Sequence, residues 1–288
     1  MKEIVVLSGK GGTGKTTIVA SFAALAKSKV LCDCDVDAAD LHLLLKPKAK
    51  ETHEFRSGQT AVINEKLCTR CGLCEEVCRF EAIKELKVDP TACEGCSFCA
   101  NVCPEDAITM EENLAGHWFV SDTKYGPLVH ARLGIAQENS GKLVTVVRQN
   151  ARSIVQKEGF EYIITDGPPG IGCPVISSLS GANLALLVTE PTLSGIHDLE
   201  RVIGVCRHFG VPPLICINKY DLNEDNTSRL ERYCLEQGIE VAAKLPFDNI
   251  VTESLINGIP VVEYGRGSIV QQLETLWSKI SGNNKRGG

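Results

Sequence analysis

Eight cysteines crowded between residues 68 and 103 constrain the fold of this chain more than any other sequence feature. They form two copies of the spacing C-x2-C-x2-C-x3-C, offset by 25 residues. The first copy is Cys68, Cys71, Cys74 and Cys78, and the second is Cys93, Cys96, Cys99 and Cys103. The repeat extends beyond the cysteines, because Ala82-Ile83 recurs as Ala107-Ile108. The sequence therefore predicts two copies of one small supersecondary unit.

The cysteines are better explained as metal ligands than as a disulfide scaffold. The chain has 288 residues, 14 cysteines and no export signal at Met1, which favours a reducing cytoplasm. The spacing is typical of bacterial two-cluster ferredoxins, in which the fourth cysteine of each copy binds the other cluster. We expect Cys68, Cys71, Cys74 and Cys103 to hold one [4Fe–4S] cluster, and Cys93, Cys96, Cys99 and Cys78 the other. Zinc is the alternative, although zinc sites pair two C-x2-C hooks and need no fourth cysteine at this spacing.

Outside this block, short β-branched runs alternate with amphipathic stretches. The expected strands are 4–8, 30–33, 162–166, 185–189, 214–218 and 241–245, and the expected helices are 15–27, 143–158, 194–208, 226–237 and 267–280. This alternation predicts an α/β fold with a mostly parallel sheet buried on both faces. We expect one domain of residues 1–62 and 113–288, and an inserted small α+β, ferredoxin-like domain of residues 63–112.

A phosphate-binding loop follows the first expected strand. Residues 9–16 read Gly-Lys-Gly-Gly-Thr-Gly-Lys-Thr, which fits G-x-x-x-x-G-K-[ST] between a strand and a helix. Backbone N–H groups converge on phosphate oxygens in such a loop, Lys15 reaches the β- and γ-phosphates, and the Thr16 hydroxyl binds Mg²⁺. The predicted nucleotide-binding residues of the loop are Gly11, Gly12, Thr13, Gly14, Lys15, Thr16 and Thr17.

The early lysine, Lys10, adds a family resemblance. The string from Lys10 to Thr17 resembles the deviant Walker A loop of the MinD/ParA/Mrp family of P-loop NTPases, relatives of the nitrogenase iron protein. In that family the early lysine reaches the nucleotide of the partner subunit. The resemblance therefore implies an Mg-dependent ATPase that acts as a nucleotide-sandwich homodimer, with Lys10 and Lys15 in catalysis.

Two further segments follow the order of this family. Asp33-Cys34-Asp35-Val36-Asp37 resembles switch I, which implies that Asp35 polarises the attacking water. The run from Asp166 to Gly170 resembles the D-x-P-P-G switch II, in which Asp166 would hold Mg²⁺ through water and the Gly170 amide would sense the γ-phosphate. Positioning and charge neutralisation dominate phosphoryl transfer, so two lysines, a metal ion and one carboxylate are a sufficient set.

The base is expected beside Asn218, which ends another apolar strand. The resemblance implies that Asn218 reads a purine and that the loop around Pro246 covers it. Asn218-Lys219-Tyr220-Asp221 also fits N-K-x-D, the guanine-reading pattern of GTPases. We expect ATP, with GTP as the open alternative.

The net charge and the apolar pattern of the chain restrict the kinds of partner that it is expected to bind. A net charge of −6 weighs against binding to nucleic acid, and no apolar run is long enough to span a membrane. The expected helix 267–280 has an apolar stripe but lacks the basic face that membrane binding needs, so this helix should pack on the protein. The stripe consists of Ile269, Val270, Leu273, Leu276, Trp277 and Ile280.

Five of the cysteines outside the repeat are expected to be buried, namely Cys32, Cys34, Cys206, Cys216 and Cys234. Cys173 is a candidate ligand of a third, dimer-bridging metal site, with a packed cysteine as the alternative.

Three functions are compatible with these motifs. In the first, the ATPase supports iron–sulfur or metallocofactor maturation, or delivers electrons to an unidentified metalloprotein or redox partner. In the second, it is an ATP-gated electron donor like the nitrogenase iron protein. In the third, it is a positioning ATPase of the MinD/ParA kind, for which clusters would be superfluous.

Overall fold

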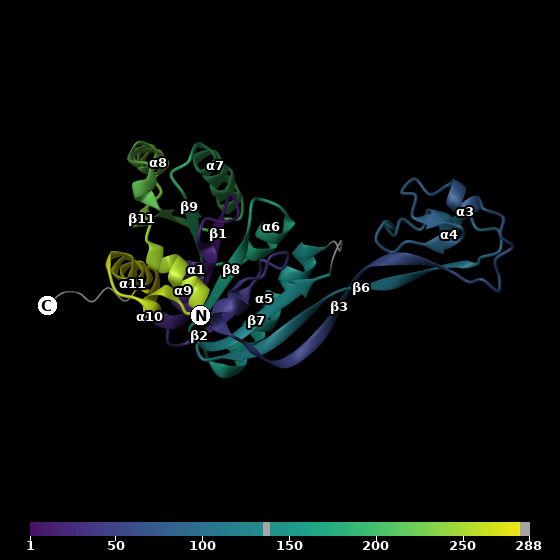
Figure 1. The fold of residues 1–288 in the computed structure, drawn as a ribbon, viewed down its shortest axis with the longest axis horizontal. Helices are drawn as coiled ribbons and strands as arrows, with labels where there is room; N and C mark the ends of the chain where they lie inside the picture. Colours follow the sequence, from purple (N-terminus) through teal and green to yellow (C-terminus); the bar gives the residue numbers. More distant parts are fainter. Residues whose placement is uncertain (135–138, 283–288) are drawn as a thin grey trace. The chain divides into compact units, whose positions relative to one another are not determined.

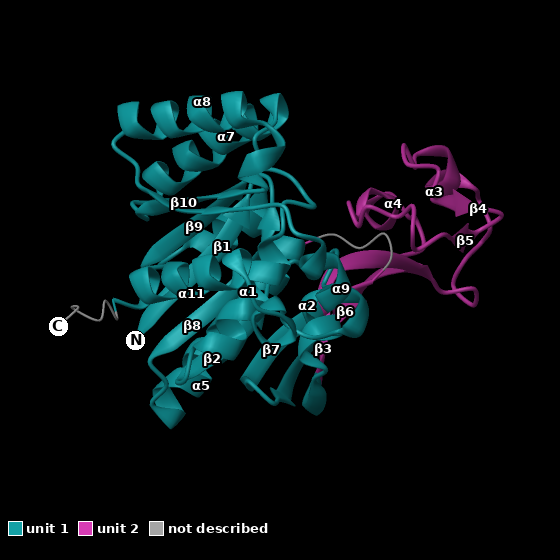
Figure 2. Ribbon diagram, turned by 60° about the vertical axis from the view of Figure 1, so that its left-hand side comes forward, with its two compact units in different colours: residues 1–52, 118–131, 140–288 teal, residues 53–117, 132–139 magenta. Residues whose placement is uncertain are grey.

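The computed structural model describes residues 1–134 and 139–282. It divides into two compact units, coloured separately in Figure 2. The first unit comprises residues 1–52, 118–131 and 140–288, and the second comprises residues 53–117 and 132–139. Two strands of 16 residues, β3 (Lys48–Ile63) and β6 (Ile108–Thr123), contribute residues to both units.

The first unit is built on a parallel sheet, visible in Figure 1. The sheet order is β11-β10-β9-β1-β8-β2-β7-β6-β3, and the pairs from β11 through β7 are parallel. Its strands, besides β3 and β6, are β1 (Lys2–Ser8), β2 (Lys29–Asp33), β7 (Gly126–Leu133), β8 (Tyr162–Pro169), β9 (Leu184–Thr189), β10 (Pro213–Asn218) and β11 (Val241–Leu245). All six strands expected from the sequence are present, which confirms the α/β class.

Helices cover both faces of this sheet, because alternate residues of each central strand point to opposite sides. Ile4 and Val6 of β1 face one apolar core, and Val5 and Leu7 face the other. The first core contains α1 (Lys15–Leu25), α2 (Leu41–Leu45), α10 (Val261–Tyr264) and α11 (Ser268–Ser281). The second contains α6 (Cys173–Leu179), α7 (Leu193–His208) and α8 (Glu224–Glu236). In addition, α5 (Ser140–Glu158) packs on α6 and β2, and α9 (Asn249–Asn257) packs on α10.

Two predictions about buried side chains are confirmed. The apolar stripe of α11, from Ile269 to Ile280, is buried in the first core, so this helix packs on the protein. Cys32, Cys34, Cys206, Cys216 and Cys234 are also buried. Among the described residues, no helix combines the length and apolar character that crossing a membrane requires.

The second unit contains two short helices that repeat after 25 residues, α3 (Leu73–Glu76) and α4 (Phe98–Asn101). Between them lies the antiparallel pair β4 (Ile83–Lys84) and β5 (Lys87–Val88). Each short helix follows a residue with left-handed backbone, Gly72 (φ 78°) before α3 and Ser97 (φ 62°) before α4. Positive φ also recurs from Arg70 to Gly95 and from Glu81 to Asp106. The sequence repeat is therefore a repeat of backbone conformation.

Backbone hydrogen bonds join the two copies reciprocally. The Asn64 N–H donates to the Ala107 carbonyl (2.8 Å), and at the equivalent positions the Asp89 N–H donates to the Ala82 carbonyl (2.7 Å). Ala82 and Ala107 are each 1% exposed, which explains why this small residue recurs in both copies. Each copy thus completes the other, and neither forms a separate lobe.

Candidate functional site

The phosphate-binding loop lies between β1 and α1 in the first unit. Gly14 is the residue before α1 and has φ 93°, a conformation that favours glycine. Gly9 is required by close packing, because a Cβ there would lie 2.3 Å from the Cβ of Asp198 in α7. Lys15, the first residue of α1, is only 6% exposed. The loop is therefore held against α7 with its lysine buried.

Three aspartates, Asp33, Asp35 and Asp166, gather near the carboxyl ends of β2 and β8, and the last two interact with Lys15. Asp33 lies opposite Asp166 in the parallel pairing, and the Cys34 N–H donates to the Asp166 carbonyl (2.8 Å). Burial raises the pKa of Asp166 to about 7, while a hydrogen bond from Thr16 and the charge of Lys15 oppose that shift. Burial also raises the pKa of Asp35, again opposed by Lys15. The fold thus brings Lys15, Thr16, Asp35 and Asp166 into one electrostatically coupled group.

This group has the chemistry of a magnesium site. Within the described part of the chain, Asp166 Oδ1 and Thr13 Oγ1 are buried without a hydrogen-bond partner. A buried polar atom without a partner is costly, and Mg²⁺ prefers carboxylate oxygens together with substrate phosphates. A hydrated Mg²⁺ on a bound nucleotide would satisfy Asp166 Oδ1 and offset the crowding of carboxylates. The residues present therefore fit the ion.

The predicted γ-phosphate sensor is engaged within the protein. The Gly170 N–H donates to the carbonyl oxygen of Ser8 at the end of β1 (2.9 Å), and Gly170 has φ 90°. This hydrogen bond ties the segment after β8 to the start of the phosphate-binding loop. The amide would have to leave Ser8 in order to bind a phosphate.

The expected base-reading residues also contact the phosphate-binding loop. The Asn218 side-chain amide donates to the Thr13 carbonyl (2.8 Å) and accepts from the Lys219 N–H (3.1 Å). Asp221, in the 3-10 turn Tyr220–Leu222, accepts a hydrogen bond from the Phe247 N–H (2.7 Å). One oxygen of the N-K-x-D aspartate therefore anchors the loop that contains Pro246, which is half-buried.

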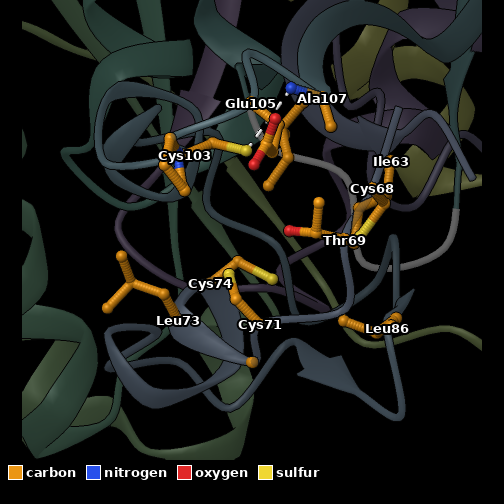
Figure 3. Close-up of a pocket in the computed structure, with 13 residues that line it drawn as sticks. Ile63, Cys68, Thr69, Cys71, Leu73, Cys74, Leu86, Cys103, Glu105 and Ala107 are labelled. Atoms are coloured by element: carbon orange, nitrogen blue, oxygen red, sulfur yellow. Dashed lines mark hydrogen bonds between the residues drawn. The ribbon is translucent and has the colours of Figure 1, made fainter.

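The eight clustered cysteines line two cavities in the second unit. One cavity is lined by Cys68, Cys71, Cys74 and Cys103, together with residues such as Leu73 and Leu86 (Figure 3). The other is lined by Cys78, Cys93, Cys96 and Cys99. Each cavity thus combines three cysteines of one copy with the last cysteine of the other. Two backbone amides point at sulfurs of the first set, Arg70 N–H at Cys68 Sγ and Ala107 N–H at Cys103 Sγ, each 3.4 Å.

Among the described residues, no three His, Cys, Asp or Glu side chains lie close enough together to hold one metal ion. Cys173 is exposed at the start of α6, in the first unit.

Comparison with known proteins identifies the family. Residues 4–261 match the family model of the CobQ/CobB/MinD/ParA nucleotide binding domain. The chain belongs to this family. It is 33% identical to Uncharacterized protein MJ0578 of Methanocaldococcus jannaschii, covering 96% of both chains. It is 25% identical to the septum site-determining protein MinD of Thermotoga maritima, covering 97% of this chain and 88% of that protein.

A solved structure agrees with the assignment at the level of the fold. The septum site-determining protein MinD of Pyrococcus horikoshii, complexed with Mg-ADP, superposes with a TM-score of 0.61 at 18% identity, covering 99% of this chain and 97% of that one. The CobQ/CobB/MinD/ParA domain, with its intact phosphate-binding loop, makes this protein a P-loop ATPase.

One charged residue of this MinD/ParA-type ATPase site was missed by the sequence analysis. Glu190, directly after β9, accepts from the Lys219 Nζ at 2.6 Å and pairs with the Lys10 Nζ at 3.5 Å. The Lys10 Nζ also lies 3.3 Å from Thr192 Oγ1 and 3.4 Å from Ser194 Oγ. The sequence signal that could have identified Glu190 is a carboxylate directly after a buried apolar strand. The phosphate-binding loop lies at the same edge of the sheet.

Proposed function

We propose that this protein hydrolyses ATP as a nucleotide-sandwich homodimer and carries two [4Fe–4S] clusters in its second unit. In this role it supports iron–sulfur or metallocofactor maturation, or passes electrons to a partner metalloprotein. ATPase activity is the activity of the family, and the proposed clusters would add iron–sulfur chemistry to it.

One observation carries the iron–sulfur part of this proposal. Each of two cavities is lined by four cysteines, three from one copy of the repeat and one from the other. That is the ligand exchange of two-cluster ferredoxins, in which the fourth cysteine of each copy crosses over. Cys68, Cys71, Cys74 and Cys103 would hold one cluster, and Cys93, Cys96, Cys99 and Cys78 the other. Such clusters supply one-electron redox chemistry when bound.

The nucleotide part assigns one task to each side chain. Backbone N–H groups of Gly11, Gly12, Gly14 and Thr17 would bind phosphate oxygens, and Lys15 would neutralise the β- and γ-phosphates. Thr16 and, through water, Asp166 would hold the Mg²⁺, which supplies charge neutralisation on the phosphates when bound. Asp35 would orient and polarise the attacking water. Lys10 would bind the partner's nucleotide, so hydrolysis would require the dimer.

ATP is favoured over GTP at the base. Asn218 would bind a purine edge while its side-chain amide still contacts Thr13. Asp221 has one carboxylate oxygen committed to the Phe247 N–H, whereas a guanine-reading aspartate uses both oxygens on two base N–H groups. The loop with Pro246 and Phe247 would then cover the adenine.

A second candidate is a positioning ATPase of the MinD kind. It is favoured by the similarity to septum site-determining proteins, among them the Thermotoga maritima protein. The eight cysteines and their two cavities have no purpose in that role. The third candidate, an ATP-gated electron donor, shares the clusters and predicts in addition that their potentials depend on the nucleotide.

The deciding experiment is metal analysis of the anaerobically purified protein. Two clusters require about eight iron atoms and about eight acid-labile sulfides per chain. A third site at Cys173 would add iron that the Cys173→Ser variant loses. Zinc in place of iron would favour the positioning ATPase. Full ATP turnover and full cellular function in a protein that contains no iron would also favour it.

A further inference from the structure

Lys10 is held within its own subunit by a carboxylate that it shares with a second lysine. Glu190 directs Oε2 at the Lys10 Nζ (3.5 Å) and Oε1 at the Lys219 Nζ (2.6 Å). The Glu190 side chain is 14% exposed and both lysine side chains are 32% exposed. The ion pairs are therefore partly shielded from water, yet both lysines can reach solvent.

The two ion pairs that Glu190 forms differ in strength. Lys219 is at the distance of a short charge-assisted hydrogen bond. Lys10 contacts Glu190, Thr192 and Ser194 only at 3.3–3.5 Å, near the outer limit of a hydrogen bond. Each lysine also has its own oxygen on Glu190. Lys10 can therefore leave while the Lys219 contact stays intact.

We propose that Glu190 is a positioning residue that holds Lys10 in its own subunit until the phosphates of the partner's nucleotide replace the carboxylate. This inference rests on the proposed sandwich dimer. It adds an interaction that opposes dimer formation, the ion pair between Glu190 and Lys10. Glu190 competes with phosphate for one ammonium group, and Lys219 weakens that competition because it neutralises part of the same carboxylate. The two residues therefore act on dimer formation in opposite directions.

The geometry fixes the sign of three substitutions. Glu190→Gln removes the charge that retains Lys10, so the nucleotide-bound dimer becomes tighter. Lys219→Met leaves Glu190 with Lys10 as its remaining lysine partner, so the dimer becomes weaker. In Glu190→Gln with Lys219→Met the carboxylate is gone, and the dimer should be about as tight as in Glu190→Gln alone.

The size of the effect follows from the symmetry of a homodimer. An ion pair of this exposure changes an equilibrium constant by about two- to fivefold. Both subunits release a Lys10 when the dimer forms, so the effect enters twice. We expect the dimer dissociation constant of Glu190→Gln to fall by about 4- to 25-fold, with a smaller change at high salt because exposed charges are screened.

The experiment is analytical ultracentrifugation of the full chain with Mg²⁺ and a saturating nonhydrolysable ATP analogue. Nucleotide affinity is measured separately with a fluorescent ATP analogue, because Lys219 is next to Asn218, the residue proposed to bind the base. This separates a change in nucleotide binding from a change in dimerisation. Glu231→Gln is the matched control, since it breaks a half-exposed ion pair with Lys244 (2.8 Å) on α8 and β11. Glu190→Asp keeps the charge and should stay close to wild type. Thermal unfolding checks that each variant is folded.

The outcomes separate this inference from the proposed function. Opposite shifts for Glu190→Gln and Lys219→Met, with Glu190→Asp and Glu231→Gln close to wild type, support it. An unchanged or weaker dimer in Glu190→Gln, while Lys10→Ala still abolishes dimerisation, overturns the role of Glu190 and leaves the sandwich intact. A wild-type dimer in Lys10→Ala overturns the sandwich and this inference with it.

Discussion

The side-chain amide of Asn218 donates a 2.8 Å hydrogen bond to the carbonyl oxygen of Thr13. This bond joins the last residue of β10 to the phosphate-binding loop, and the two bonded residues are 205 positions apart in the chain. The same amide oxygen accepts from the Lys219 N–H, and Lys219 has φ 55°. Asn218 therefore links the end of β10 to the phosphate-binding loop and to the residue that follows it.

Asn218→Ala should weaken ATP binding. The variant loses the contact proposed for the base, which is worth about one net hydrogen bond, so affinity should fall by about three- to tenfold. Isothermal titration calorimetry with Mg-ATP measures it. Asn257→Ala is the control, because the Asn257 amide donates to the Glu253 carbonyl of α9 and to the Tyr264 hydroxyl of α10. Equal affinity in Asn218→Ala and wild type would remove Asn218 from the site.

Lys10→Ala should abolish nucleotide-dependent dimerisation while each subunit still binds ATP. Lys15 and the backbone amides of the phosphate-binding loop remain in place, and the cysteines lie in the other unit, so iron content should not change. Sedimentation with Mg²⁺ and a nonhydrolysable ATP analogue tests this directly. A sedimentation coefficient that rises with nucleotide as in wild type would refute the sandwich.

Asp35→Ala should bind ATP but hydrolyse it at least about a hundredfold more slowly, in the range expected for a lost proton-handling group. The variant keeps Thr16 and Asp166 for the Mg²⁺. Asp37→Ala is a close control, because Asp37 is exposed two residues later in the same segment. Phosphate release at saturating ATP is the measurement, and normal turnover in Asp35→Ala would exclude it from catalysis.

Pairs of cysteine substitutions test how the two copies share ligands. Cys68→Ala with Cys103→Ala changes one cavity and should leave about four iron atoms per chain. Cys68→Ala with Cys93→Ala changes both cavities and should leave almost none. If each copy instead bound its own cluster, Cys93→Ala with Cys103→Ala would spare about four iron atoms. Iron analysis after anaerobic purification distinguishes these patterns.

His130 should make the ATPase unit sensitive to mild acid. Burial, with His42 nearby, lowers the pKa of His130 from 6.5 to about 4. The unfolded chain therefore binds more protons than the folded one between these values, and stability falls as pH decreases from about 6.5 to 4. His130→Gln should flatten this part of the pH profile and match wild type in slope above pH 7.

Chemical denaturation of the two proteins across pH 4–8 measures this effect. His208→Gln is the control, because His208 is an exposed histidine. An identical pH slope in His130→Gln and wild type would mean that folding does not lower the pKa of His130.

The sequence predicted the parts of the fold that have buried apolar patterns. Strands such as β1 have four consecutive residues without exposure, from Ile4 to Leu7, so their apolar runs are visible without a structure. By contrast, β3 and β6 were not predicted. Most of the 16 residues of β3 are polar and exposed, and its pairing with β6 joins segments far apart in sequence. No local pattern records such a pairing.

The same reasoning explains what was found and missed in the site. The predicted residues Lys15, Asp35, Asp166 and Asn218 stand in short motifs, each within or shortly after an apolar strand. Glu190 also follows such a strand, but its two lysine partners come from loops that meet only in the folded chain. The engagement of the Gly170 N–H with Ser8 likewise depends on how β1 and β8 pair, with a shift in register between Val6 and Ser8.

The most direct test of the central claim is a low-temperature EPR-monitored redox titration of the anaerobically purified protein, with and without Mg²⁺ and a nonhydrolysable ATP analogue. We predict signals of two reduced [4Fe–4S] clusters, together about two spins per chain. Potentials that shift with nucleotide would favour gated electron transfer, and constant potentials would favour maturation or delivery. A fully reduced protein without any [4Fe–4S] signal would contradict the account.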